Sequence, residues 1–167
     1  MRVEVMESVK KFLLWLAASR FGIWIMKNVF SRLDPVLYRL SGGRFTATGP
    51  VLIPYLILNT TGRKSGQKRS IQLVYTDVDG DPHVVASNFG QEHHPAWFYN
   101  LVAQPEVTIE LGSETIPVQA VRLSGEEGEA VWDTLVANVP NYALYKARAV
   151  REINIFRFER RVEEATA

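Results

Sequence analysis

The chain contains no cysteine, and only three of its 167 residues are histidines. The absence of cysteine excludes disulfide bonds, thiolate metal sites and a cysteine nucleophile. It leaves the redox compartment open, so the cytoplasm is only the default expectation. The sequence has no Walker A motif and no internal repeat. We expect no metal site, because the neighbouring His93 and His94 rarely face one ion together and no carboxylates complete the set.

The N-terminal segment lacks a hydrophobic run long enough to cross a bilayer. Its longest uncharged stretch, residues 12–19, is far shorter than the ~20 residues that a membrane-spanning helix needs. A secretory signal is disfavoured as well, because acidic residues precede the stretch and a second apolar block follows Arg20. The net charge of the whole chain is only +1, which argues against a general nucleic-acid-binding protein.

Positive charge is concentrated in residues 1–44, which hold eight cations and three acids, whereas the rest of the chain has a net charge of −4. The same segment contains "FLLWLAASRFGIWIMKNVF" (residues 12–30), which predicts one or two largely apolar helices. Such helices either pack on the domain or lie in a membrane interface. We expect Trp15, Leu16, Ile23 and Trp24 to cover the substrate side of a pocket. Residues 1–30 are also the candidate for peripheral contact with the inner face of the membrane.

From Phe45 onward the pattern changes to short β-rich runs separated by turns. It predicts a strand in residues 48–60, two strands around the turn Asp79-Gly80-Asp81 within residues 69–88, a hairpin over Gly112 and Ser113, and a last strand in residues 153–161. Helices are expected in residues 94–104, 124–139 and 141–150. The pattern predicts a mainly β (α+β) domain of residues 45–167, built as a small closed or split β-barrel with flanking helices and preceded by the helical segment of residues 1–44.

The connection between two of these strands, "TTGRKSGQKRS" (residues 60–70), holds four cations and two glycines but no acid. Glycine lets backbone N–H groups turn toward a ligand, and Arg and Lys bind phosphate or carboxylate oxygens. Physical chemistry alone leaves two interpretations open: an anion-binding loop, or a solvated turn whose lysines maintain solubility.

Three stretches, "LILNTTGRKSGQKRSIQLVY", "VVASNFGQEHHPAWFYNLVAQPEVTIE" and "YALYKARAVREINIFRFE", resemble the deazaflavin-dependent nitroreductase family. The resemblance covers roughly residues 45–160. It implies a split β-barrel of the FMN-binding, pyridoxamine-phosphate-oxidase-like type. It also implies the deazaflavin coenzyme F420 in preference to FMN, with a phosphate and a polyglutamate tail that give the basic hairpin an anionic ligand.

The resemblance also implies roles for individual residues. The predicted coenzyme contacts are Lys64 and Arg69, with Arg63, Ser65, Gln67 and Lys68 near the phosphate and tail, and Ala86, Ser87, Asn88, Ala96 and Trp97 near the ring. Tyr142 and Tyr145, three residues apart on one helix face, are the predicted substrate-facing and catalytic side chains together with Ser87. Arg151 is expected to order the pocket lid or contact the substrate. For Trp97 and for both tyrosines, simple packing in the core is the alternative interpretation.

The implied reaction is hydride transfer from the reduced coenzyme to a small apolar electrophile such as a quinone, a nitroaromatic compound or an enone. Two alternatives stay open: a non-catalytic carrier of a coenzyme or fatty acid, and a lipid-binding protein of the membrane surface. Two positions depart from the family pattern. Asn88 replaces a usual Lys or Gly, which weakens one anion contact, and Gln72 replaces a usual Pro, which puts the local strand geometry and a contact with the coenzyme ring in question. The sequence predicts neither the physiological substrate nor the oligomeric state.

Overall fold

The computed structural model describes residue 29 and residues 31–46, 49–50 and 54–161. Its helices are α3 (Ser31–Leu40), the short 3-10 helix η2 (Asn88–Gly90), α4 (Ala96–Ala103), α5 (Gly125–Asn138) and α6 (Asn141–Arg148). Its strands are β1 (Phe45–Thr46), β2 (Gly49–Pro50), β3 (Tyr55–Thr61), β4 (Lys68–Val74), β5 (Thr76–Val78), β6 (Asp81–Val85), β7 (Glu106–Leu111), β8 (Glu114–Leu123) and β9 (Ile155–Arg160). The predicted helix of residues 12–30 lies almost wholly outside the described residues, as do Trp15, Leu16, Ile23 and Trp24.

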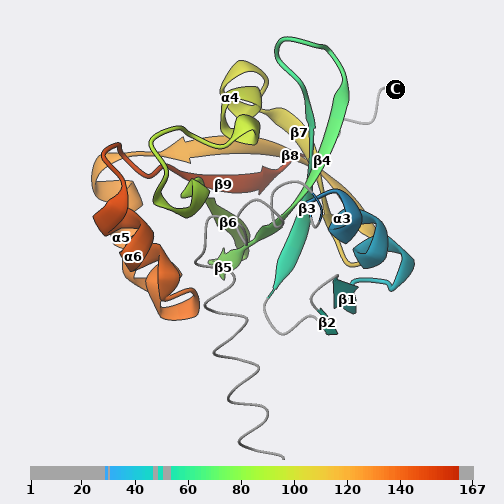
Figure 1. Cartoon of the computed structure of the whole chain (residues 1–167), viewed down its shortest axis with the longest axis horizontal. Coiled ribbons are helices and arrows are strands. Elements are labelled where there is room, and N and C mark those ends of the chain that lie inside the picture. The colour runs from blue at the N-terminus through green and yellow to red at the C-terminus, as the bar shows by residue number, and fades with distance from the viewer. Residues whose placement is uncertain (1–28, 30, 47–48, 51–53, 162–167) are drawn as a thin grey trace, which may run out of the picture.

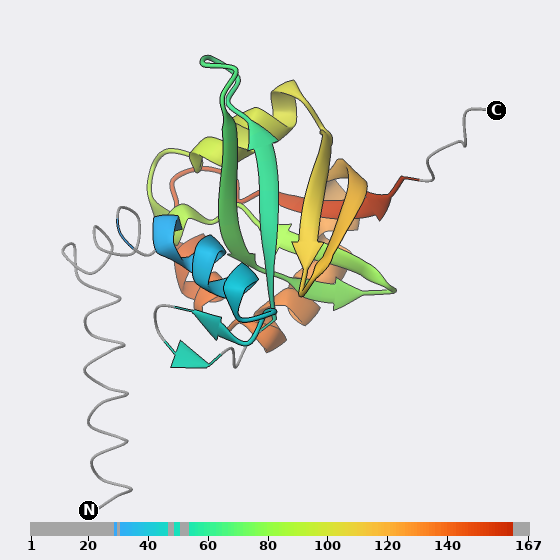
Figure 2. The same cartoon turned by 90° about the vertical axis from the view of Figure 1, so that its right-hand side faces the viewer.

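Seven strands form one antiparallel sheet in the order β4-β3-β7-β8-β9-β6-β5, and β1 pairs with β2 separately. The large sheet curls, so that β9, β6 and β5 run at a steep angle to β3 and β4 (Figure 1). Figure 2 shows the same curl from the side, with α3 against the β3 and β4 end and α5 and α6 behind the opposite end. The half-barrel with flanking helices confirms the predicted fold class.

Apolar alternation along the strands produces two buried clusters. In the larger one, Leu56 and Leu58 of β3 and Phe158 of β9 are completely buried, and the aromatic side chains of α4 pack against them. The second cluster forms where α5 and α6 meet the sheet, around Leu135 and Ile155. Burying large apolar side chains is the main favourable contribution to folding, at roughly 25 cal/mol per Å². The clusters therefore fix where α4 and α6 sit.

One strand prediction was wrong in detail. The run after the basic hairpin, expected as a single strand before the turn at Asp79, divides at Tyr75 into β4 and β5, which lie at opposite edges of the sheet. Tyr75 instead donates its backbone N–H to the carbonyl of Pro54 (3.1 Å). The turn itself is confirmed, because Asp79 and Gly80 both have positive φ, as a tight hairpin turn requires. The chain thus crosses from one sheet edge to the other within a few residues.

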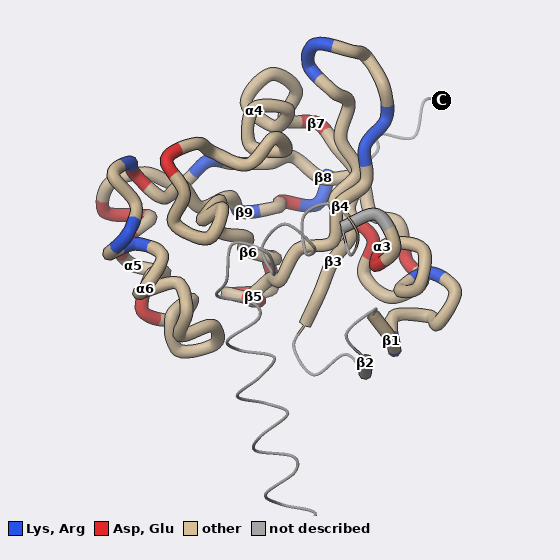
Figure 3. Tube along the Cα trace, in the orientation of Figure 1, with Lys and Arg blue, Asp and Glu red and all other residues tan. Residues whose placement is uncertain are grey.

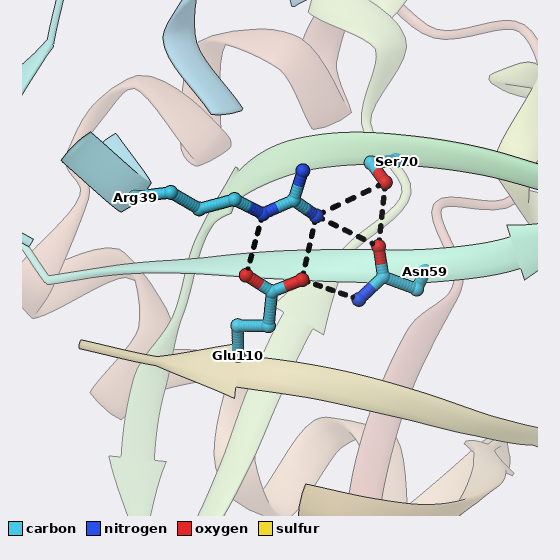
Figure 4. Close-up of polar contacts among 4 residues, drawn as sticks. All are labelled: Arg39, Asn59, Ser70 and Glu110. Atoms are coloured by element: carbon cyan, nitrogen blue, oxygen red, sulfur yellow. Dashed lines mark hydrogen bonds and ion pairs between the residues drawn. The ribbon is translucent and has the colours of Figure 1, made fainter. Parts of the chain in front are cut away.

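Helix α3 is anchored to the outer face of the sheet by a polar network (Figure 4). Arg39 makes a bidentate ion pair with Glu110 of β7, at 2.7 and 2.6 Å. Asn59 donates to the same carboxylate (2.7 Å) and accepts a hydrogen bond from Ser70 (2.5 Å). The Arg39 bond lowers the pKa of Glu110. The network joins α3 to β3, β4 and β7, so this helix of the N-terminal segment packs on the sheet.

Candidate functional site

The basic loop between β3 and β4 is a compact turn at the end of a projecting hairpin, and its cations gather there (Figure 3). The Gly62 N–H donates to the carbonyl of Gln67, and the Gly66 N–H donates to the carbonyl of Gly62, both at 2.8 Å. Gly66 has a φ of +66°, and a Cβ at Gly62 would lie 2.7 Å from the Ser65 hydroxyl oxygen. The positive φ favours glycine at Gly66, whereas a side chain at Gly62 would require the Ser65 hydroxyl to rotate away.

The four cations of the hairpin, Arg63, Lys64, Lys68 and Arg69, are exposed, and none forms an ion pair with a residue that the structure describes. The Arg63 guanidinium lies over the ring of Tyr99, 4.9 Å from its centre. Arg69 donates to the Gln67 side chain at 3.0 Å. Because neighbouring strand residues point to opposite faces, Lys68 and Arg69 place positive charge on both sides of the hairpin. The positive charge of the hairpin is therefore available to bind an anion.

Asn100 ties the hairpin to α4 and was missed by sequence reasoning. This buried side chain accepts the Arg63 backbone N–H (3.1 Å) and donates to the Thr60 hydroxyl (3.1 Å). A buried polar group is costly unless it is hydrogen-bonded. The available signal was the lone Asn within the apolar helix "AWFYNLVA", which indicates a specific polar partner.

A second loop, residues 86–91, follows β6 and contains three of the predicted ring contacts, Ala86, Ser87 and Asn88. Ala86 and Ser87 are buried. Asn88 and Phe89 adopt positive φ values of 47° and 58°, which non-glycine residues rarely do. The Asn88 amide donates to the carbonyl of His93 at 2.6 Å, so Asn88 stabilises the loop from within. Arg151 lies against this loop, with its Nη2 atom 2.9 Å from the carbonyl oxygen of Ser87.

Helix α6 brings the two tyrosines to the same loop. The rings of Phe89 and Tyr145 meet edge to face with centres 5.9 Å apart, and those of Tyr142 and Tyr145 with centres 6.4 Å apart. Burial raises the pKa of both tyrosines. Tyr142 is 7% exposed and belongs to the second apolar cluster, whereas Tyr145 is half-buried. Tyr145 is therefore the better placed of the two to reach a ligand.

The remaining predicted ring contacts lie at the start of α4. Trp97 is 6% exposed, and its ring meets Phe156 of β9 edge to face with centres 6.0 Å apart. Its indole is thus part of the core, in agreement with the packing alternative, and any contact with a coenzyme stays a prediction. Ala96 is exposed beside it.

A groove of about 710 Å³ lies on the outer face of the sheet, lined in part by Asn59, Thr61, Lys68 and Arg161. None of its lining residues comes from residues 86–97 or from α6. Only the hairpin cations Lys68 and Arg69 are shared between this groove and the predicted coenzyme contacts.

The family model described as F420H(2)-dependent quinone reductase matches residues 30–160. The F420H(2)-dependent quinone reductase Rv1261c of Mycobacterium tuberculosis is 33% identical over 145 residues, which are 83% of this chain and 97% of that protein. A solved F420-H2 dependent reductase (FDR-A) is 37% identical, with a TM-score of 0.58 over 64% of this chain and 94% of that one. A second solved structure, described as a domain-swapped dimer, is 35% identical, with a TM-score of 0.60 over 75% of this chain and 95% of that one.

Proposed function

The chain belongs to the F420H(2)-dependent quinone reductase family, and on that basis we propose that it reduces quinone-like, apolar electrophiles at a site between the basic hairpin and the loop of residues 86–91. The family assignment confirms the resemblance drawn from the motifs. It also confirms that the protein is a reductase and that its coenzyme is F420. Enzymatic function replaces the carrier and lipid-binding alternatives.

The observation that supports the hairpin as the coenzyme site is its unneutralised charge. Four exposed cations without an ion-pair partner among the described residues fit a phosphate and a tail of carboxylates. Lys64 and Arg69 would hold the phosphate, with Arg63, Ser65 and Gln67 beside them. Lys68, on the opposite face of β4 from Arg69, would meet the tail. The turn glycines and Asn100 keep these donors in one place before a ligand arrives, which lowers the entropic cost of binding.

When bound, the reduced coenzyme supplies the hydride. The protein's own residues position the coenzyme and the substrate, exclude water from the site and supply a proton. In the proposed site Ala86, Ser87 and Asn88 line the ring. Two hydroxyl groups are available there: the buried Ser87 belongs to the loop, and the ring of the half-buried Tyr145 contacts Phe89 of the loop. A tyrosine hydroxyl is protonated at neutral pH at its ordinary pKa of about 10, and burial raises the pKa of Tyr145 further, which suits a donor of a hydrogen bond to a substrate oxygen.

Titrating the coenzyme by its ring fluorescence tests the hairpin assignment. We expect Lys64→Ala and Arg69→Ala each to weaken binding by about 1.5–3 kcal/mol, the range of charge-assisted hydrogen bonds. Arg160→Ala removes an equally exposed cation from β9 and should leave affinity unchanged. Preference for the long-tailed coenzyme over FMN should shrink as salt rises. Equal affinity in the wild type and both hairpin variants would remove the hairpin from the site.

The substrate class needs a second measurement. We expect oxidation of the reduced coenzyme to be faster with quinones than with nitroaromatic compounds or enones, and Tyr145→Phe to lower turnover while affinity for the coenzyme stays nearly intact. Measuring Tyr145→Phe with quinones, nitroaromatic compounds and enones shows whether the loss of turnover depends on the oxygen group of the substrate. A Tyr145→Phe variant that loses coenzyme but keeps full turnover at saturation would place Tyr145 in the coenzyme site instead.

Peripheral membrane contact from the cytoplasmic side is part of the proposal, and α3 supplies an observation in its favour. Leu33, Val36, Leu37 and Leu40 are 38–81% exposed on this helix, next to the equally exposed Phe45. Exposed apolar side chains at this helical spacing, in a segment of residues 1–44 whose sequence holds eight cations and three acids, suit an anionic lipid surface. Among the described helices, none is long and apolar enough to cross a membrane.

Vesicle co-sedimentation tests this contact. The wild type should bind phosphatidylglycerol vesicles more strongly than phosphatidylcholine vesicles, and the double substitution Leu37→Asp and Leu40→Asp should abolish binding without changing turnover of a water-soluble quinone. Binding that survives the double substitution would exclude α3 as the contact.

A further inference from the structure

Arg151 uses every hydrogen-bond donor of its guanidinium within the protein. Nε donates to the carbonyl of Gln91 (3.0 Å). Nη2 donates to the carbonyls of Ala86 (3.2 Å) and Ser87 (2.9 Å). Nη1 donates to the carbonyl of Glu152 (3.0 Å) and lies 3.1 Å from Nδ1 of His94. An arginine side chain has five N–H donors in a fixed planar fork, and here five acceptors are in place.

Three of these acceptors belong to a backbone segment that is costly to maintain. Asn88, Phe89 and Gly90 have successive φ values of 47°, 58° and 75°. A left-handed conformation at a non-glycine residue costs about 1–2 kcal/mol and persists only where the surroundings enforce it. The guanidinium donates hydrogen bonds to backbone carbonyls on both sides of this turn, at residues 86–87 and at residue 91. Arg151 is thus a side chain that can enforce it.

His94 is the one side-chain acceptor of Arg151, and this fixes its protonation state. A guanidinium can only donate, so Nδ1 must accept and the proton of the neutral ring lies on Nε2. The ring is stacked on Phe98 with centres 4.0 Å apart and planes 13° apart. Burial, and then the charges of Arg151 and Arg122, lower the pKa of His94, against an opposing effect of Glu152. The ring therefore stays neutral at neutral pH and joins Arg151 to α4.

We propose that Arg151 is a positioning residue for the coenzyme: with neutral His94, it holds residues 86–91 in the left-handed turn that receives the deazaflavin ring. The inference rests on the proposed function, since it assumes that this loop binds the ring. It chooses between the two roles predicted for Arg151. A guanidinium with all five donors engaged has none left for a substrate.

The test compares Arg151→Ala and Arg151→Lys with Arg122→Ala in the full chain. Arg122 is a matched control, because it lies over the same Phe98 ring (5.8 Å) and pairs with Glu152 but, among the residues that the structure describes, donates no hydrogen bond to the loop. We expect hydrogen exchange of residues 86–94 to accelerate in both Arg151 variants without coenzyme, and the Kd for F420 to rise at least about tenfold, equivalent to 1.4 kcal/mol. Arg122→Ala should change neither quantity. Millimolar guanidinium should restore the affinity of Arg151→Ala for F420, because it can occupy the same acceptors. It would not restore the affinity of a variant that fails to fold.

His94→Phe adds a pH arm, since it keeps the stacking but removes the acceptor and its titration. Protonated His94 cannot accept from Arg151 and repels it, so wild-type affinity for F420 should fall as pH drops below the ordinary histidine value near 6.5. The variant should bind more weakly at neutral pH but lack this decline. The charged and titratable groups that face the imidazole ring are Arg151, Arg122, Glu152 and Tyr99.

Three outcomes are decisive. If Arg151→Ala leaves loop exchange and Kd unchanged while Lys64→Ala weakens binding, the positioning role is wrong and the proposed site stands. If the substrate KM rises while the coenzyme Kd is unchanged, Arg151 contacts substrate and the proposal fails. If Lys64→Ala, Arg69→Ala and Arg151→Ala all leave Kd unchanged, the proposed coenzyme site itself is wrong, and the inference falls with it.

Discussion

Gly90 is a point of close backbone contact between the loop of residues 86–91 and α6, and replacing it by alanine tests that contact. A Cβ at Gly90 would lie 3.0 Å from the carbonyl oxygen of Tyr145 and 3.0 Å from the Cβ of Arg148. These atoms belong to the helix backbone and its first side-chain carbon, so neither can rotate away. Alanine at this position therefore requires α6 to move away from the loop.

The size of the effect follows from two costs. Alanine at a φ of +75° costs about 1–2 kcal/mol, and overpacking a close contact costs typically about 1–3 kcal/mol more. Gly112 isolates the first cost, because it has a similar φ of +61° but nothing lies within 4 Å of its Cβ position. We therefore expect Gly90→Ala to lower the free energy of unfolding by about 2–5 kcal/mol and Gly112→Ala by about 1–2 kcal/mol.

Urea unfolding of both variants measures this difference, and turnover with a quinone measures its consequence. Because Tyr145 moves with α6, Gly90→Ala should lower turnover in the fraction that stays folded, whereas Gly112→Ala should keep wild-type turnover. The reasoning is refuted if the two variants lose the same stability and the same activity. That result would mean that the loop and α6 do not depend on one another.

Three further outcomes are expected. Asn100→Leu should cost about 1–3 kcal/mol of stability, measured by urea unfolding, because it leaves a buried hydroxyl and a backbone N–H unpaired, and it should weaken coenzyme binding, measured by fluorescence titration. Arg39→Gln should lower the free energy of unfolding by at most about 1 kcal/mol, since the ion pair with Glu110 is partly exposed. The pair contributes fully above the ordinary carboxyl pKa, and this contribution is lost as pH falls through the lowered pKa of Glu110. Identical acid unfolding curves for the wild type and Arg39→Gln would contradict this contribution. Tyr142→Phe should change stability more than turnover and Tyr145→Phe the reverse, as burial of the two side chains dictates, and a reversed order in paired unfolding and kinetic assays would exclude this division.

Most of the fold could be predicted from the sequence because its signals are local. Turn residues between alternating apolar runs predict the hairpins over Asp79 and over Gly112. The division at Tyr75 has no such signal, because no Gly or Pro interrupts "QLVYTDV" and only the closure of the whole sheet decides which edge each part joins. Gln72 shows the reverse case: it departs from the usual Pro, yet it pairs regularly with Ile57. The strand geometry that it put in question is therefore normal.

The contacts around the candidate site could not be predicted from the sequence. The family motif predicts the hairpin and the loop of residues 86–88 as the coenzyme site, and this assignment stays a prediction. It could not show that Arg39 meets Glu110 across 71 positions or that Asn100 meets Thr60 across 40. Polar pairs of this kind leave no periodic signal, since one hydrogen bond needs only one residue on each partner. An isolated polar residue in an apolar helix is the most that the sequence offers.

Helix α4 explains why both loops keep a fixed separation. Near its end, Asn100 holds the start of the basic hairpin through the Arg63 N–H. Just before its start, His94 stacks on Phe98 and accepts from Arg151, which holds the second loop. A helix is rigid over eight residues, and Phe98 and Leu101 bury this one in the core. The stretch "HPAWFYN" therefore carries His94 and Asn100 at opposite ends of one rigid helix. In the proposed site, this helix sets the distance between the residues that would hold the phosphate and those that would hold the ring.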